Sequence, residues 1–379
     1  MTQASVFKAA AVFDGVKLHE GAAIRFGANG VETFGAGVEI FSGAEVIDLG
    51  GEIISPGFVD LQVNGGGGIM LNDDPSVETV RRIAEAHWSL GTRAFLPTLI
   101  TDTREKTKAA IAAVTQAVEK CVPGVAGLHL EGPHLSVARK GAHDATYIRP
   151  MDDEDLDFLI AAARTLPALL LTIAPENTTI VQVRQLSQAG ALVSIGHSNA
   201  DYATVQDYAA AGAKCVTHLF NAMSQMSNRE PGVVGAALRT GALSSGLIAD
   251  GIHVHPEMMR IALSAKSGPG EVFLVSDAMA VAGTSETSFE LDGRKILRSD
   301  GRLTLEDGTL AGADLDLLTA VRVLVDQVDI PLADALRAAT KTPAELIDGK
   351  PFNLLGRPQD SFIRISRDLH ALSPLAETG

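Results

Sequence analysis

Three residues at the ends of apolar runs have the side chains of a catalytic metal site. Glu131 closes the run "GLHLE", His197 follows "LVSIG" and His218 follows "KCVT". Two imidazoles and one carboxylate are the protein ligands of catalytic zinc sites that keep a position open for water. A lone histidine is usually a structural residue. Two histidines and a glutamate in equivalent places instead favour the binding of a divalent ion. The donors suit Zn²⁺ and also accept Fe²⁺, Co²⁺ or Mn²⁺.

A further carboxylate and a further histidine could move protons beside such an ion. Asp277 ends the run "FLVSD", where a buried charge needs a metal, a cation or a proton. The alternative interpretation is that Asp277 has a structural role and caps the N-terminus of a helix. Beside a metal we interpret Asp277 as the general base that takes a proton from water and returns it to a leaving amine. His143, in the loop "RKGAHD", is a candidate for polarising a substrate carbonyl.

A local group of polar and cationic residues indicates an anionic substrate group. Arg229 lies in "SNREPG", His253 in "DGIHV", and Asn221 follows His218 in "THLFNAM". A loop arginine is usually a solvated charge, but an Arg, a His and backbone N–H groups at one mouth suit a phosphate. The run Gly65–Gly68 lacks the lysine and the helix of a P-loop, so a tight turn is expected there.

The elements that must position these residues are eight apolar runs separated by amphipathic stretches. Val/Ile/Leu-rich runs alternating with helices indicate a parallel sheet buried on both faces, and eight such units match a (β/α)₈ TIM barrel. In that fold the active site lies at the carboxyl ends of the strands, where Gln62 and Asn64 also fall on the first run and His253 on the seventh. The runs cover residues 57–65, 91–100, 124–132, 168–176, 191–199, 213–221, 246–254 and 271–279.

The flanking segments predict a smaller β domain and an insertion. Residues 1–54 read as short strands broken by glycine, and "DSFIRIS" is a strand-like piece of the tail that could rejoin them. Segment 285–313 predicts a hairpin-rich insertion after the eighth strand, followed by helical stretches over about 314–328 and 332–347. The expected domains are 1–54 with 350–379, a small β-sandwich domain, and 55–349, the barrel.

Composition excludes several classes of protein. The 379 residues carry 31 basic and 46 acidic side chains, a net charge of −15 that disfavours nucleic acid and anionic lipid as partners. Two cysteines, Cys121 and Cys215, are too few for a disulfide framework. Neither a signal peptide nor an apolar run long enough for a membrane helix is evident. We therefore expect a cytoplasmic protein.

Several motifs together resemble the N-acetylglucosamine-6-phosphate deacetylase family of the metal-dependent amidohydrolase superfamily. The resemblance runs in order from about residue 50 to 345, through "PGFVDLQVNGGGG", "HLEGPHL", "RKGAHD", "SIGHSNA", "THLFNAMS", "REPGVVGAAL", "IADGIHVHP", "LVSDAM" and "GTLAGA". It implies hydrolysis of N-acetyl-D-glucosamine 6-phosphate to D-glucosamine 6-phosphate and acetate. It also implies a barrel joined to a small β domain made from both chain ends, and a homodimer.

The resemblance further implies a role for each matching residue. The metal would lie on Glu131, His197 and His218, with Asp277 as acid and base and His143 at the acetyl carbonyl. The phosphate would be bound by Arg229 and His253, partly across the dimer interface. Other matching residues would lie along the sugar or close over it; they are Ala142, Asn221 and Ala222, then Leu310, Ala311, Gly312 and Ala313.

Two departures from the superfamily pattern bear on the number of metal ions. Many members have His-x-His on the first strand and a carboxylated Lys on the fourth, whereas this chain has Gln62 and Asn64 and no Lys in "ALLLTIAPE". Neutral amides bind a second dication weakly, so we expect one ion per subunit. The tail after Gly356 also departs from the family's usual ending.

Two alternative functions stay open on the sequence. Another amidohydrolase, such as a dihydroorotase-like enzyme or an N-acyl amino acid deacetylase, would not need Arg229 and His253. A metal-stabilised barrel that only senses a sugar phosphate would not need Asp277 and His143.

Overall fold

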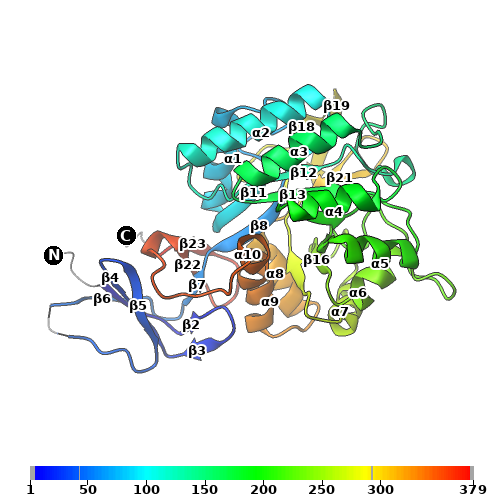
Figure 1. Ribbon diagram of the computed structural model, residues 1–379. Coiled ribbons are helices and arrows are strands. Elements are labelled where there is room, and N and C mark those ends of the chain that lie inside the picture. The colour runs from blue at the N-terminus through cyan, green and yellow to red at the C-terminus, as the bar shows by residue number, and fades with distance from the viewer. Residues whose placement is uncertain (1–4, 42, 292, 376–379) are drawn as a thin grey trace.

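A parallel eight-stranded barrel forms the centre of the computed structural model, which describes residues 5–41, 43–291 and 293–375 (Figure 1). Neighbouring strands pair in chain order, as expected for a (β/α)₈ barrel. The strands are β8 (Phe58–Val63), β11 (Thr92–Ile100), β12 (Leu128–Glu131), β13 (Leu169–Ile173), β14 (Leu192–Ile195), β15 (Cys215–Val216), β16 (Ser244–Leu247) and β17 (Val272–Leu274).

The barrel closes where the first strand, β8, meets the chain that follows β17. The Asp277 N–H donates to the Gln62 carbonyl at 3.1 Å, and the Asn64 N–H donates to the Ala278 carbonyl at 2.9 Å. Deeper in the seam, the fully buried Asp60 carboxylate accepts from the backbone N–H of Ser276 at 3.2 Å. A carboxylate thus takes the place of a backbone acceptor in this seam.

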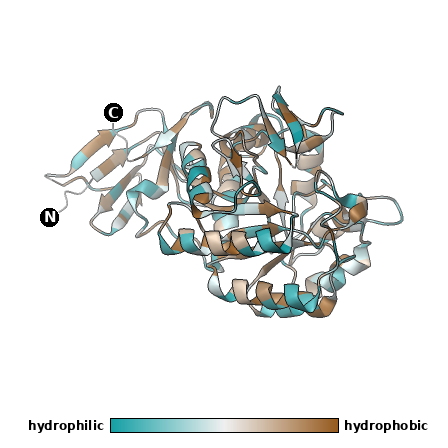
Figure 2. Cartoon of the chain, turned by 90° about the horizontal axis from the view of Figure 1, so that it is seen from above, coloured by the Kyte–Doolittle hydropathy of each residue, from teal (hydrophilic) through white to brown (hydrophobic). Residues whose placement is uncertain are grey.

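Helices surround the strands with their apolar faces turned inward. In α1, Val80, Ile83 and Ala84 are buried, and Ser76 caps the helix by accepting from the Thr79 N–H. Both hydrophobic and hydrophilic residues occur along the helices in Figure 2, as expected for helices that turn one side to the strands and the other to solvent. The helices after successive strands are α1 (Val77–Ser89), α2 (Arg104–Glu119), α3 (Asp153–Thr165), α4 (Ile180–Gln188), α5 (Tyr202–Ala211), α6 (Gly232–Arg239), α7 (Pro256–Ala265) and α8 (Leu317–Asp326).

The segment between β17 and α8 is a four-stranded antiparallel sheet, as the hairpin-rich sequence predicts. Its strands are β18 (Ser288–Leu291), β19 (Arg294–Ser299), β20 (Arg302–Thr304) and β21 (Leu310–Ala313). We call these four strands the roof sheet, because residues of β18 and β21 line the cavity described below. The Ala313 N–H donates to the Asp277 carbonyl at 3.0 Å, which ties the roof sheet to the end of the eighth strand.

The sequence predicts one helical stretch over 332–347. This prediction is wrong in one respect, because the segment forms two helices. They are α9 (Leu332–Ala339) and α10 (Lys341–Asp348), with a break at Thr340, whose φ is −131° and ψ −78°. Pro343 lacks the N–H that would bond to the Ala339 carbonyl in one continuous helix, and its ring would clash there. α8 lies inside the other expected stretch, 314–328.

Both chain ends build the small β-sandwich domain, which lies to one side of the barrel in Figure 1. β22 (Phe362–Ile365), inside "DSFIRIS", pairs antiparallel with β7 (Ile53–Pro56), and β23 (Leu372–Pro374) adds a further strand that the sequence does not reveal. The other strands are β1 (Ser5–Lys8), β2 (Ala11–Phe13), β3 (Leu18–Glu20), β4 (Ala23–Gly27), β5 (Gly30–Gly35) and β6 (Glu45–Asp48); the short hairpin β9 (Gly65–Gly66) with β10 (Ile69–Met70) lies outside both sheets.

Phe26 makes one edge-to-face aromatic contact within its own sheet, to Phe7, and one with the other sheet of this domain, to Phe362. The Phe26 ring lies 5.8 Å from Phe7 and 5.4 Å from Phe362, between centroids, so a residue near the C-terminus packs into the N-terminal core. The predicted fold class is confirmed. The domain boundaries, 1–54 with 350–379 and 55–349, remain our proposal, which the pairing of β22 with β7 supports.

Replacing Asp60 by Asn is expected to remove one source of pH-dependent stability. Burial raises the pKa of Asp60 from 3.8 to about 7. Ionisation therefore destabilises the folded protein progressively as the pH rises from about 4 to about 7. Asn keeps an oxygen for the backbone N–H donors but does not ionise.

The melting temperature of Asp60→Asn relative to wild type should therefore rise between about pH 5 and about pH 8, by the equivalent of about 1–4 kcal/mol. Asp207→Asn, at an exposed position on α5, is the control and should show no such trend. A pH-independent difference for Asp60→Asn would contradict the assignment.

Candidate active site

The proposed catalytic side chains come from the carboxyl ends of four barrel strands. Glu131 is the last residue of β12, whereas His197 and His218 lie two residues beyond β14 and β15, and Asp277 three beyond β17. His197, His218 and Asp277 have φ values of 47°, 28° and 51°, a backbone region that non-glycine residues rarely adopt. Such conformations cost about 1–3 kcal/mol each and cluster at functional sites, where the surroundings enforce them.

Glu131, His197 and His218, which we call the ligand triad, converge on one point. The Glu131 Oε1 atom lies 3.2 Å from His197 Nε2 and 3.0 Å from His218 Nε2, and the two Nε2 atoms are 3.0 Å apart. Ligand atoms about 2.0–2.1 Å from a tetrahedral ion lie about 3.3 Å from one another. The triad therefore fits a divalent metal ion.

A second grouping of Glu131 with His143 and His197 is looser. Its donor atoms lie within 4.8 Å of one another. His143 Nδ1 is also hydrogen-bonded to Thr101, which fixes the orientation of the ring. The ligand triad is therefore the tighter of the two groupings.

Neighbouring groups orient the ligand triad for metal binding. His197 Nδ1 lies 2.8 Å from the Arg139 carbonyl, so it carries the proton and leaves the Nε2 lone pair facing Glu131. Burial favours a raised pKa for Glu131, but the His197 and His218 imidazoles beside it outweigh burial and hold the pKa well below its usual value. The carboxylate is therefore ionised, as a metal ligand must be.

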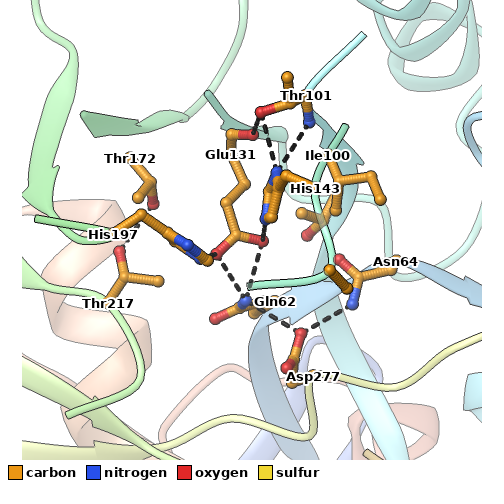
Figure 3. Close-up of polar contacts among 12 residues, drawn as sticks. Gln62, Asn64, Ile100, Thr101, Glu131, His143, Thr172, His197, Thr217 and Asp277 are labelled. Carbon is orange, nitrogen blue, oxygen red and sulfur yellow. Dashed lines mark hydrogen bonds and ion pairs between the residues drawn. The ribbon is translucent and has the colours of Figure 1, made fainter. Parts of the chain in front are cut away.

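The Gln62 side-chain amide lies between the two carboxylates of the site (Figure 3). Its nitrogen is 3.2 Å from both Glu131 oxygens and 3.0 Å from Asp277 Oδ1, which also accepts from Asn64 Nδ2 at 2.7 Å. Burial, and then the charge of Glu131, raises the pKa of Asp277 to about 6. A carboxylate in this state can accept a proton near neutral pH and release it again.

His143 presents an N–H donor to the same cavity. Its Nδ1 atom accepts from the Thr101 backbone N–H at 3.3 Å and lies 2.8 Å from the Thr101 hydroxyl, so the ring proton resides on Nε2. Nε2 is 3.9 Å from Glu131 Oε2. Burial is the main cause that lowers the pKa of His143 to about 3, so the ring is neutral at working pH. A neutral Nε2–H can donate to a substrate carbonyl oxygen.

A cavity of about 200 Å³ brings most of the expected residues together. It is lined by the ligand triad, Asp277 and His143, and by six of the expected substrate-binding residues, which are Ala142, Asn221, Ala222, His253, Leu310 and Gly312. Sequence reasoning did not identify the apolar residues of its wall, Ile100, Ile248, Met279 and Leu291. Ile100, Ile248 and Met279 lie at or just beyond the ends of barrel strands, and only Leu291 comes from the roof sheet. Apolar side chains at these places look like ordinary core residues in the sequence.

Four expected residues are placed differently from the prediction. Ala311 and Ala313 are buried on the far side of β21 from Leu310 and Gly312, because side chains alternate along a strand. Arg229 is exposed on a tight turn closed by Ser227 and Glu230, and does not line the cavity of its own chain.

His253 also differs from its expected place, although it lines the cavity. It lies six residues beyond the end of β16, in a turn, and not at the strand end. The buried Asp250 carboxylate holds this turn, since it accepts from the His253 backbone N–H at 2.7 Å and lies 2.6 Å from His253 Nδ1. Asp250 is in the same "ADGIH" motif, which is the signal that could have identified it.

Comparison with known proteins assigns the chain to a family. The pattern of the Amidohydrolase family matches residues 53–348, and the chain belongs to that family. It is 44% identical over 291 residues to the N-acetylgalactosamine-6-phosphate deacetylase of Shewanella sp. (strain ANA-3), spanning 77% of this chain and 73% of that protein. It is 39% identical over 312 residues to the N-acetylglucosamine-6-phosphate deacetylase of Haemophilus influenzae, spanning 82% and 81%.

Solved structures agree with the sequence relatives. The crystal structure of N-acetylglucosamine-6-phosphate deacetylase from Pasteurella multocida superposes with a TM-score of 0.90 at 33% identity, covering 97% of this chain and 96% of that one. The resemblance expected from the motifs is therefore confirmed. No helix in the described part of the chain is both long and apolar enough to cross a membrane.

Asp277→Asn is expected to lower kcat at least about 100-fold, the lower end of general acid–base contributions. Asn keeps the shape and can still accept from Gln62 and Asn64, but it cannot take a proton. Metal content by elemental analysis should equal that of wild type. Asp307→Asn, an exposed turn residue, is the control. A mutant that kept more than about a tenth of wild-type kcat would refute the general-base role.

Proposed function

We propose that this protein hydrolyses N-acetyl-D-glucosamine 6-phosphate to D-glucosamine 6-phosphate and acetate. The observation that carries the proposal is the convergence of the ligand triad, the proton acceptor Asp277 and the N–H donor His143 on one cavity. Hydrolysis of an amide needs an activated water, a base to take its proton, an acid for the leaving amine and stabilisation of the carbonyl oxygen. The relatives named above are deacetylases of amino-sugar phosphates.

Each residue then has a defined part in the reaction. Glu131, His197 and His218 would hold one divalent ion per subunit, for which we propose Zn²⁺; when bound, it supplies Lewis acidity and lowers the pKa of water. Asp277 takes a proton from the attacking water at its carboxylate and returns it to the leaving nitrogen. His143 donates its Nε2–H to the acetyl oxygen. Gln62 and Asn64 hold Asp277 in place by donating to Oδ1.

The C4 epimer of the sugar is the second candidate substrate. The Shewanella relative, at 44% identity, is named for N-acetylgalactosamine 6-phosphate, whereas the Haemophilus relative, at 39%, is named for the glucosamine compound. Both substrates have the same acetamide and phosphate, so the ligand triad, Asp277 and His143 serve either one. The selection between them depends on the groups that contact the 4-hydroxyl.

Phosphate binding is the proposed role of His253 and Arg229, and it involves a second subunit. His253 lines the cavity, but Arg229 is exposed on its own chain and would contact the phosphate of a partner's site. Met226 on the same loop is 51% exposed, as expected for an apolar side chain that a homodimer covers. The free thiol of Cys121 fits the proposed cytoplasmic location.

A substrate panel tests the function directly. With zinc-loaded protein, acetate release should be fastest from N-acetyl-D-glucosamine 6-phosphate or its C4 epimer, and at least about 100-fold slower from the unphosphorylated sugars, judged by kcat/KM. Equal kcat/KM without the phosphate would favour another amidohydrolase activity. Binding of the phosphorylated sugars without acetate release would favour a sensor.

Arg229→Ala is expected to raise KM for the phosphorylated sugar with little effect on kcat, if the phosphate is bound equally in ground and transition states. Loss of a charge-assisted hydrogen bond corresponds to about 1.5–3 kcal/mol. Arg239→Ala, in helix α6, provides a matched loss of one positive charge.

The same variant tests whether Arg229 acts in the partner's site. Mixing Arg229→Ala with inactive Asp277→Asn subunits should restore part of the wild-type kcat/KM, because one site of each mixed dimer then has both residues intact. An unchanged KM in Arg229→Ala, or no recovery on mixing, would contradict this role.

A further inference from the structure

The roof sheet contacts the chain on both sides of the catalytic cavity. On one side β21 bonds to the Asp277 carbonyl through Ala313. On the other side the Arg294 guanidinium, at the start of β19, donates to the Ala142 carbonyl at 2.8 Å. Leu291 and Met279 belong to the apolar cluster that packs the sheet against the barrel, and both also line the cavity. The roof sheet is thus part of the cavity wall and in contact with the loop that carries His143.

The loop that carries His143 depends on such contacts for its position. It joins β12 to α3 over residues 132–152 and contains one 3₁₀ turn, Val137–Arg139, as its regular structure. Loops of this length are mobile unless other elements hold them. Its catalytic nitrogen must nevertheless stay close to the position of the substrate carbonyl, since misplacement by about 1 Å can cost about 100-fold in rate.

The bond from Arg294 acts on the peptide unit that determines the orientation of His143. The Ala142 carbonyl and the His143 N–H belong to the same planar peptide group. Arg294 binds its oxygen, and the His143 N–H donates to the Lys140 carbonyl at 3.1 Å. With both ends of that plane fixed, and Nδ1 bound by Thr101, the imidazole has one orientation, with Nε2 toward the cavity.

We propose that Arg294 is a positioning residue that acts through His143, by holding the Ala142–His143 peptide from the roof sheet. The proposal rests on the proposed function, because it assumes that His143 polarises the acetyl carbonyl. Arg294 itself does not line the cavity, so its effect on catalysis is indirect. Arg294 and Ala142 are 152 positions apart in the sequence, so this hydrogen bond links the roof sheet to a distant loop that carries His143.

Arg294→Met is the variant that tests the proposal, because it keeps the apolar stem and removes the donors. We expect kcat for the phosphorylated sugar to fall about tenfold, with KM changed less than about twofold, since the lost interaction serves the transition state. Arg302→Met, an exposed arginine of the same sheet on β20, should change neither constant. Arg294→Lys, which keeps a positively charged donor group, should recover part of the loss.

A double-mutant cycle with His143→Gln distinguishes positioning from a general effect on folding. If Arg294 acts through His143, Arg294→Met should change kcat by less than about twofold in the His143→Gln background. The Arg294→Met loss should also shrink on an N-trifluoroacetyl substrate, whose carbonyl needs less polarisation, and a structural role would not produce that dependence on the acyl group.

The experiment distinguishes failure of the proposed role of Arg294 from failure of the proposed role of His143. The same tenfold loss in both backgrounds, or no loss in wild type, would overturn the role of Arg294. A His143→Gln variant with wild-type kcat would instead refute the role of His143 in the proposed function. If Arg294→Met does not fold, Arg294→Lys in the same cycle gives the comparison.

Discussion

The site depends on keeping two buried carboxylates close together. Glu131 and Asp277 are 2% and 9% exposed, and each charge raises the free energy of the other. The neutral Gln62 amide donates to both, at 3.0–3.2 Å. Glu131 is stabilised as an anion by two imidazoles, whereas Asp277 is left with a pKa of about 6. Glu131 is therefore suited to bind a cation, and Asp277 is suited to exchange a proton.

The seam that closes the barrel produces this arrangement. Gln62 and Asp277 are brought side by side by the hydrogen bond between the Asp277 N–H and the Gln62 carbonyl. The left-handed φ of 51° at Asp277 belongs to the same turn, from which the Asp277 carbonyl binds the roof sheet. Barrel closure, the placement of Asp277 and the attachment of the roof sheet are therefore properties of one short segment.

The sequence predicts the barrel and most of the site because parallel strands end at one rim. Apolar runs give the strands, and the polar residue after each run gives Glu131, His197, His218 and Asp277. The alternation of Leu310 and Gly312 with Ala311 and Ala313 could also have been predicted from the period of two in a strand.

Other features depend on contacts that local patterns do not encode. Arg229 is exposed because a tight turn presents it outward, and its proposed partner is a second subunit. The bond from Arg294 to Ala142 joins a hairpin to a loop in another part of the barrel. No periodicity of the sequence relates these two segments.

We propose that Glu131, His197 and His218 hold a single divalent ion, which anomalous diffraction at the zinc edge would locate. Crystals of protein loaded with zinc and freed of excess should show one strong peak per subunit, about 2.0–2.2 Å from Glu131 Oε1 and from both Nε2 atoms. Two strong peaks in one mouth, or a peak bound by His143 in place of His218, would contradict the account.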